Sequence, residues 1–170
     1  MMSFSHLRED FPTLCGDNAP AYLDNACVTL KPKQVIEAIS DYYGKYPGCG
    51  GRSVHRYGTK VSKLVQESRN SISKFINSNS PSEVVFTGNA TSSLNQISKG
   101  LSWKKGDIIL TGDREHNSNL VPWLQLQEEQ GVEHRVVKSN PDNTFSMENF
   151  EQACSDAGDR LKLVSMSHVG

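Results

Sequence analysis

Apolar residues recur every three or four positions over two early stretches of the chain, which is the spacing of an amphipathic helix. The longer stretch, from about residue 59 to 76, has these side chains on one helical face: Val61, Leu64, Val65, Ser68, Ile72, Phe75 and Ile76. The shorter stretch follows Pro32 and ends at Gly44, and its apolar face consists of Val35, Ile36, Ile39 and Tyr43. The sequence therefore predicts two helices, separated by a glycine-rich loop at residues 46–53.

From residue 83 onward, short β-rich runs alternate with helical patterns. The predicted strands lie at 83–87, 107–111, 132–137 and 161–166, and the predicted helices follow Thr91, span 120–131 and span 146–154. Such alternation is typical of an α/β protein with a mostly parallel sheet. Because the last run ends where a loop and another helix are expected, we expect an incomplete domain.

Composition excludes several classes of function. A chain of 170 residues with 36% hydrophobic content can bury one core, and a net charge of -1 lacks the basic excess of a nucleic-acid-binding protein. No run approaches the roughly 18 apolar residues of a membrane span, and no signal peptide is evident, so we expect a cytoplasmic protein without membrane contact. The four cysteines form no C-x-x-C pair, so neither a zinc site nor a redox dithiol is indicated, and no metal-binding residue is expected.

Two loops are candidates for chemistry, because parallel α/β sheets bind ligands at the carboxyl ends of their strands. Residues 87–93, Thr-Gly-Asn-Ala-Thr-Ser-Ser, combine a helix N-terminus with small residues and hydroxyls. This combination suits a phosphate site, although Thr91 or Ser92 acting as an ordinary helix cap is the more common explanation of a single loop of this type. It is not a P-loop, because no Gly-Lys-Ser/Thr follows.

The second loop, residues 112–119, places His116 between a strand and a helix. An imidazole there can lie over an aromatic ligand and move a proton near neutral pH, or it can be a solvated surface group. Arg52, which follows Gly50 and Gly51, can bind a carboxylate in a bidentate manner or be a solvated loop arginine. His134 is expected on the outward face of its strand.

These segments, in this order, resemble the class V aminotransferase-like enzymes that use pyridoxal phosphate, and within them the cysteine desulfurases. The motifs are Tyr22-Leu-Asp-Asn-Ala26, Arg52-Ser-Val-His55, Glu83-Val-Val-Phe-Thr-Gly-Asn-Ala-Thr91, and Glu115-His-Asn-Ser-Asn119 with Pro122-Trp123. The resemblance runs from about residue 9 to the end and covers only the N-terminal half of such an enzyme.

The resemblance implies a three-layer α/β/α architecture of the aspartate aminotransferase type (fold type I). Residues 1–57 correspond to an N-terminal segment at the active-site entrance. Residues 58–170 correspond to the first half of the large domain that binds pyridoxal phosphate, and the C-terminal half is absent.

The resemblance also implies roles for individual residues. The backbone of Ala90 and the residue Thr91 correspond to the binding site of the cofactor phosphate. His116 corresponds to the histidine that stacks on the pyridine ring and relays a proton. Ala90 replaces the first threonine of the family's usual pair, and Ser92 replaces a glutamate.

On the substrate side, Asp24, Asn25 and Ala26 correspond to the family's opening segment. Arg52 corresponds to an arginine that lines the active site. These four residues are the expected binding residues for an amino-acid substrate.

The implied reaction is that of a cysteine desulfurase, which transfers sulfur from L-cysteine to an enzyme persulfide and releases alanine. A homodimer and a sulfur-acceptor protein are the implied partners. The family's cofactor lysine and nucleophilic cysteine belong to the absent half, so the chain alone is not expected to turn over. Selenocysteine lyase, aminotransferase and epimerase reactions stay open, as does a non-catalytic α/β module that binds a partner as half of a split enzyme.

Overall fold

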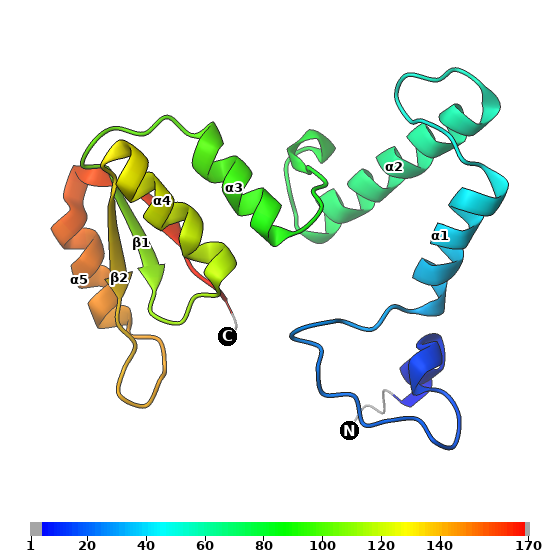
Figure 1. Cartoon of the computed structure of the whole chain (residues 1–170), viewed down its shortest axis with the longest axis horizontal. Coiled ribbons are helices and arrows are strands. Elements are labelled where there is room, and N and C mark those ends of the chain that lie inside the picture. Colours follow the sequence, from blue (N-terminus) through cyan, green and yellow to red (C-terminus); the bar gives the residue numbers. More distant parts are fainter. Residues whose placement is uncertain (1–4, 169–170) are drawn as a thin grey trace. The chain divides into compact units, whose positions relative to one another are not determined.

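The computed structural model describes residues 5–168. The chain divides between Val85 and Phe86 into two compact units. The first unit is coloured blue to green in Figure 1 and contains α-helices and short 3-10 helices, which are labelled η. They are η1 (Ser5–Asp10), η2 (Pro12–Leu14), α1 (Lys33–Lys45), α2 (Arg56–Phe75) and η3 (Pro81–Glu83). The predicted boundary between residues 57 and 58 refers to the complete fold and stays a prediction.

Both helices predicted in the first half of the chain are confirmed. Helix α1 begins directly after Pro32, and α2 begins at Arg56, upstream of its apolar pattern. The earlier start of α2 has a local cause, because Nδ1 of His55 accepts the backbone N–H of Gly58 at 3.4 Å and so caps the first turn. The apolar faces of both helices remain partly exposed in this unit, with Ile39 at 55% and Ile72 at 37%.

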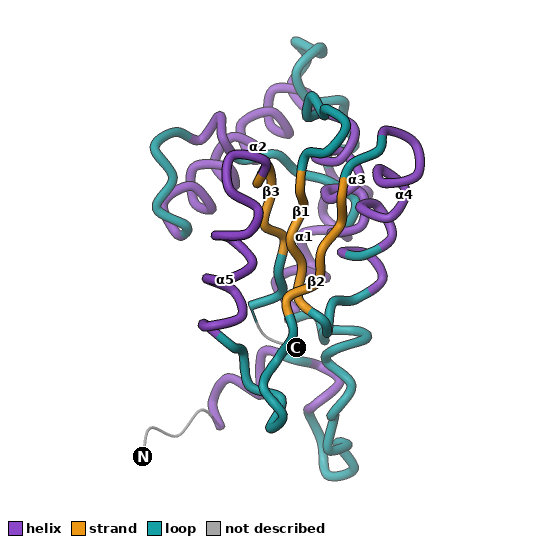
Figure 2. The backbone as a smooth tube through the Cα atoms, turned by 90° about the vertical axis from the view of Figure 1, so that its left-hand side faces the viewer, coloured by secondary structure: helices purple, strands orange, loops and turns teal. Residues whose placement is uncertain are grey.

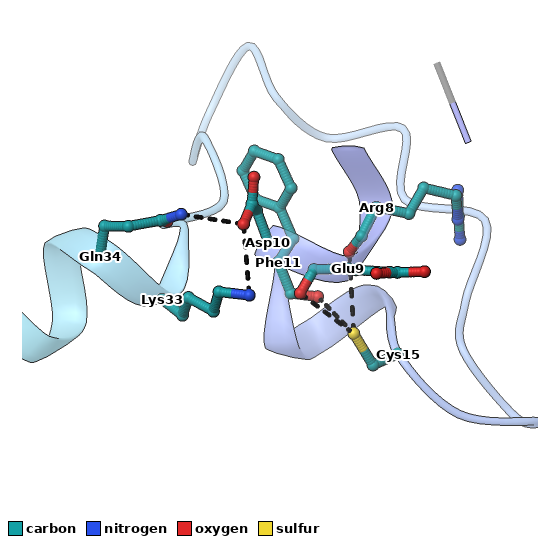
Figure 3. A network of polar contacts seen from close by, with 7 residues as sticks. All are labelled: Arg8, Glu9, Asp10, Phe11, Cys15, Lys33 and Gln34. Atoms are coloured by element: carbon teal, nitrogen blue, oxygen red, sulfur yellow. Dashed lines mark hydrogen bonds and ion pairs between the residues drawn. The ribbon is translucent and has the colours of Figure 1, made fainter. Parts of the chain in front are cut away.

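A polar network joins η1 to the start of α1 (Figure 3). Asp10 accepts a hydrogen bond from the Gln34 amide at 2.8 Å and forms an ion pair with Lys33 at 3.3 Å. The hydrogen bond from Gln34, and then the contact with Lys33, hold the pKa of Asp10 below its usual value. The Cys15 thiol donates toward the Phe11 carbonyl at 3.3 Å. The intervening residues 16–32 are thereby held at both ends.

The strand predicted at residues 83–87 is wrong. Glu83 ends η3, and Val84 has an extended backbone, but the structure assigns no strand to this run. The β-branched and aromatic side chains favour an extended conformation locally, whereas a strand also needs a ladder of hydrogen bonds to a neighbour. Among the described residues the three strands pair only with one another.

The second unit is a parallel sheet with helices on both faces. Its elements are α3 (Ala90–Gly100), β1 (Ile108–Gly112), η4 (Asn117–Asn119), α4 (Val121–Gln130), β2 (Glu133–Val137), α5 (Met147–Ala157), η5 (Gly158–Arg160) and β3 (Leu161–Ser165). The strand order is β2-β1-β3, and both pairings are parallel. The three later strands and all three helices predicted in this half are confirmed.

Side chains from alternate positions of β1 build a core on each face of the sheet. Ile109 packs with Trp123 and Leu126 on the face covered by α3 and α4. Ile108 and its neighbour two residues on, Leu110, pack beneath α5 on the other face. Figure 2 places α5 on one side of the strands and α3 with α4 on the other. The predicted three-layer α/β/α arrangement is therefore confirmed in this unit.

The connections between strands bring the loops of interest to one edge of this sheet. Helix α4 links β1 to β2, and α5 links β2 to β3 across the opposite face, so β1 is central and the strand order reverses around it. Helices α3 and α4 both begin at the end of the sheet where β1 ends (Figure 1). In open α/β sheets this carboxyl edge is where ligands bind.

Candidate functional site

The loop before α3 forms a braced turn at the start of that helix. Oδ1 of Asn89 accepts the backbone N–H of Ser92 at 2.8 Å and caps the helix. The expectation that Thr91 or Ser92 provides this cap is therefore wrong, because Asn89 already lies in the extended conformation of a cap residue. The hydroxyls of Thr87 and Ser93 lie 2.7 Å apart and join the loop to the helix.

The start of α3 retains donors that suit an anion. The backbone N–H groups of Ala90 and Thr91 have no acceptor among the described residues, and both residues are exposed. A Cβ added at Gly88, just before this helix, would meet nothing within 4 Å, so the space beside that residue is open. Paired N–H groups, a nearby hydroxyl and the positive end of the helix dipole form a donor set that fits a phosphate group.

His116 lies in the loop that follows β1, directly before η4. Its Nδ1 accepts the backbone N–H of Ser118 at 3.1 Å and lies 2.9 Å from the Ser118 hydroxyl, so the ring caps η4. Because Nδ1 is an acceptor in this arrangement, the neutral ring carries its proton on Nε2. Nε2 has no hydrogen-bond partner within residues 5–168, and the ring is exposed.

The structure brings His116 and the phosphate-type loop to the same part of the second unit. Helix α3 contacts η4, the short helix that His116 caps. Ala90 and Thr91 are the first two residues of α3, and His116 is the cap residue directly before η4. A flat, phosphate-bearing ligand therefore has donors for its anion on α3 and an aromatic ring on the neighbouring element.

Asp24, Asn25 and Ala26 lie in a turn of the first unit. The Tyr22 hydroxyl donates to the Val28 carbonyl at 2.5 Å, and the Asp24 carbonyl accepts the N–H of Val28 at 3.0 Å. Asp24, Asn25 and Ala26 are all exposed. Tyr22 thus closes a loop that presents this segment to solvent.

Arg52 lies in the glycine-rich loop before α2, and its guanidinium has no hydrogen bond or ion pair among the described residues. The loop is packed tightly against the first turn of α2. A Cβ added at Gly58 would lie 2.5 Å from Cβ of Ser53, and the N–H of Gly51 donates to Ser62 at 2.8 Å. The cation is therefore available to a carboxylate, on a loop whose base is fixed.

These candidate residues fall into two sets. Asp24, Asn25, Ala26 and Arg52 belong to the first unit, whereas Ala90, Thr91 and His116 belong to the second. The structure brings together the members of the second set through α3 and η4. The meeting of both sets in one site stays a prediction.

An open cavity of about 710 Å³ lies at the carboxyl edge of the sheet. It is lined by the end of β1 and the loop after it, the loop after β2 and the segment after β3, with residues Gly112–Glu115, Ser139, Asn143, Phe145 and Met166–His168. Asp113 closes one wall, because its carboxylate accepts the N–H and the hydroxyl of Ser139 at 3.0 and 2.6 Å. These hydrogen bonds lower the pKa of Asp113.

The sequence profile of the aminotransferase class-V family matches residues 21–170. The chain belongs to this family. The predicted class V fold is thereby confirmed, and the named relatives agree with the resemblance to cysteine desulfurases. A "probable cysteine desulfurase" of Synechocystis sp. is 34% identical over 171 residues, and one of Pyrococcus abyssi is 36% identical over 165 residues.

The apo structure of a cysteine desulfurase from Thermococcus onnurineus NA1 has the same fold, with a TM-score of 0.87 at 32% identity. It is matched over 100% of this chain and 41% of its own. The two relatives are matched over 96% of this chain and over 40% and 39% of their own lengths. This class V chain therefore spans about two fifths of the length of the proteins it resembles.

Sequence reasoning missed the residues that hold the His116 loop of this class V aminotransferase chain in place. The Glu115 carboxylate accepts hydrogen bonds from Ser167 and Asn119, and the Asn119 amide reaches Ser165 and Trp123. Glu115, Asn119 and Trp123 belong to the motif that suggested the family, so the motif itself carried the signal. Nothing in the local sequence indicated the partners of Asn119 and Glu115, Ser165 and Ser167, which lie 46 and 52 residues further along the chain.

His134 is not the outward-facing strand residue that the sequence suggested. Its Nε2 lies 2.9 Å from the Thr111 hydroxyl, and its backbone N–H donates to the Gln127 side chain on α4. Thr111 is fully buried and His134 is half-buried. Burial lowers the pKa of His134 below its usual value, because it disfavours the charged ring.

Proposed function

We propose that this chain forms the phosphate-binding and ring-stacking side of a pyridoxal-phosphate-dependent cysteine desulfurase. In this proposal the enzyme transfers sulfur from L-cysteine to an enzyme persulfide and releases alanine. The observation that carries it is the neighbouring placement of the open donors of Ala90 and Thr91 and the exposed ring of His116, through the contact between α3 and η4. The named relatives support the choice of cysteine desulfurase within the family.

Each residue has a defined part in this proposal. Ala90 and Thr91 donate backbone N–H groups to the cofactor phosphate, and the Thr91 hydroxyl adds a further donor. His116 lies over the pyridine ring, fixes its plane, and exchanges a proton through Nε2. When bound, pyridoxal phosphate supplies the electron sink that stabilises charge at the substrate α-carbon.

On the substrate side, we assign Arg52 to the carboxylate of L-cysteine. A guanidinium without an intramolecular partner binds a carboxylate through two parallel hydrogen bonds. Asp24, Asn25 and Ala26 then form part of the wall around the amino acid. A homodimer and a sulfur-acceptor protein complete the proposal. Because no lysine of the chain lies in the family's Ser-x-His-Lys segment, the 170 residues by themselves are expected not to turn over.

The test uses pyridoxine 5'-phosphate, which keeps the ring and the phosphate but lacks the aldehyde that reacts with surface lysines. Titration into the labelled chain is followed by the NMR signals of the Ala90 and Thr91 amides and of the His116 ring. We expect these signals to shift together, with pyridoxine lacking the phosphate giving a much smaller response. Thr91→Val weakens the response, and Thr144→Val, in an exposed turn, serves as the matched control.

A response confined to residues outside the loop before α3 and η4 contradicts the proposal. For the reaction itself, the protein as purified from its natural source is supplied with pyridoxal phosphate and L-cysteine, and alanine and persulfide are quantified. Formation of another product from cysteine, or none, overturns the assignment as a desulfurase.

A further inference from the structure

The Glu115 carboxylate is a junction between two loops at the carboxyl edge of the sheet. It accepts the backbone N–H of Ser167 at 2.9 and 3.1 Å, the Ser167 hydroxyl at 2.7 Å and the Asn119 amide at 2.7 Å. Ser167 follows β3, and Asn119 ends η4. One side chain therefore joins the loop after β1 to the segment after β3.

The space for this carboxylate depends on a glycine. A Cβ added at Gly112 would lie 2.9 Å from Oε1 of Glu115, which is closer than real Cβ contacts come. The last residue of β1 thus leaves room for the carboxylate to lie over it. Two separate features, the converging donors and the missing Cβ, favour a carboxylate at this point.

The junction continues into the core through Asn119. Oδ1 of Asn119 accepts the Trp123 indole N–H at 3.1 Å and the Ser165 hydroxyl, and its amide also donates to the Ser165 carbonyl at 3.2 Å. Trp123 is fully buried and Asn119 is 8% exposed. His116 is covalently adjacent to Glu115 and caps the short helix that ends at Asn119. Its backbone is consequently fixed on both sides.

We propose that Glu115 is a positioning residue, which holds His116 in place by fastening the loop after β1 to Ser167 and Asn119. This inference rests on the proposed function for the meaning of the His116 position, but the position itself can be measured without any cofactor. The carboxylate acts as an acceptor only. An amide whose oxygen takes the place of Oε2 would direct its NH₂ group at the backbone N–H of Ser167, which lies 2.9 Å from Oε1, and so weaken the junction.

The ionisation of Glu115 provides a second test of this positioning role. Burial raises the pKa of Glu115, but the hydrogen bonds from Asn119 and Ser167 outweigh it, so the pKa lies below its usual value. The other titratable or charged groups around the cavity are Asp113, Arg114 and His168, and His116 lies beside it in the chain. Protonation of Glu115 in acid removes an acceptor, so the loop loosens as the pH falls through this pKa.

The experiment compares Glu115→Gln with the wild-type chain by two readouts. Tautomer-sensitive ¹⁵N spectra report the His116 ring, and hydrogen exchange reports the amides of residues 113–120 and 165–168. We expect the variant to lose the single Nε2–H tautomer and to exchange about 10- to 100-fold faster, as for a lost hydrogen bond to a charged group. Glu128→Gln, an exposed change on α4, is the matched control and leaves both readouts unchanged.

The pH profile separates positioning from a general loss of stability. Exchange in the wild-type loop should accelerate in acid, whereas exchange in Glu115→Gln should be fast throughout and insensitive to pH after correction for the intrinsic rate. Asp113→Asn should retain the wild-type acid transition. If Glu115→Gln fails to fold, Ser167→Ala removes one donor and should change the same signals less strongly.

Each outcome decides a different question. An unchanged His116 ring and unchanged loop exchange in Glu115→Gln and in Ser167→Ala overturn the positioning role. A displaced ring in Glu115→Gln, together with a wild-type chain that does not respond to pyridoxine 5'-phosphate, supports the positioning role and contradicts the proposed function. A normal ring together with a normal response to pyridoxine 5'-phosphate contradicts only the positioning role.

Discussion

The indole N–H of Trp123 donates to Oδ1 of Asn119 at 3.1 Å, and this hydrogen bond joins the core of the second unit to its carboxyl edge. Trp123 packs against Ile109 of the central strand, and Asn119 contacts Ser165 at the end of β3. The same tryptophan therefore fills the core and orients a side chain of the candidate site.

Replacement of Trp123 by Phe should lower the free energy of unfolding by about 1–3 kcal/mol, because the variant loses a buried hydrogen bond and part of the ring volume. Urea unfolding followed by far-ultraviolet circular dichroism measures the change. Val121→Ala, an exposed position on the same helix, should stay within about 0.5 kcal/mol of the wild type. A Trp123→Phe chain as stable as the wild type would contradict the importance of this contact.

Two glycines in the first unit make a matched pair. At Gly58 a new Cβ would lie 2.5 Å from Cβ of Ser53, so Gly58→Ala should destabilise the loop that carries Arg52 by about 1–3 kcal/mol. At Gly44, inside α1, a new Cβ would meet nothing, so Gly44→Ala should stabilise the helix by about 0.5–1 kcal/mol. Hydrogen exchange of residues 49–58 and of α1 measures both effects. Equal behaviour of the two variants would refute the packing of this loop.

The cap at Asn89 separates helix stability from anion binding. Asn89→Ala removes the acceptor for the Ser92 N–H and should cost about 1 kcal/mol of stability in denaturant titrations. Asn89→Asp keeps the cap and the stability, but its negative charge beside the donors of Ala90 and Thr91 should weaken the binding of pyridoxine 5'-phosphate about fivefold. Undiminished binding by Asn89→Asp would argue against a phosphate at this position.

His134 should make the second unit sensitive to mild acid. Its pKa in the folded chain lies below the usual 6.5, so the unfolded chain binds a proton first as the pH falls. The stability from the neutral ring is complete above about pH 6.5 and is lost as the pH drops through the folded pKa. Urea titrations between about pH 7.5 and about pH 5 should show a steeper loss for the wild type than for His134→Gln. His6→Gln, at an exposed position, is the control and should follow the wild type.

The periodicity of the chain was sufficient to predict the helices and the parallel sheet, because the apolar side chains of these elements recur at the spacing of a helix or form the short apolar run of a strand. Ile108, Ile109 and Leu110 form a continuous apolar run, as expected for a strand covered on both faces. The run at residues 83–87 has similar composition, but a strand depends on a neighbour that local sequence does not specify. Composition alone cannot distinguish the two cases.

Residues of the candidate site could be predicted from the sequence, whereas the side chains that hold them in place could not. Loop position and motif order pointed to Thr91 and His116. The cap at Asn89 competed with two hydroxyls of similar capping strength, and the backbone conformation decided between them. The Glu115 junction required the end of β3, which meets β1 only in the folded sheet. Contacts between residues so far apart in the sequence are determined by the order in which the strands pair.

The boundary of the two units, between Val85 and Phe86, also separates the tryptophans of the chain from its tyrosines. Both tryptophans, Trp103 and Trp123, lie in the second unit, and all five tyrosines lie in the first: Tyr22, Tyr42, Tyr43, Tyr46 and Tyr57. Indole emission therefore reports the sheet and its carboxyl edge, whereas phenol emission reports the first unit, whose loops hold the substrate-side residues. The two halves of the proposed site can be followed at separate wavelengths in one unlabelled sample.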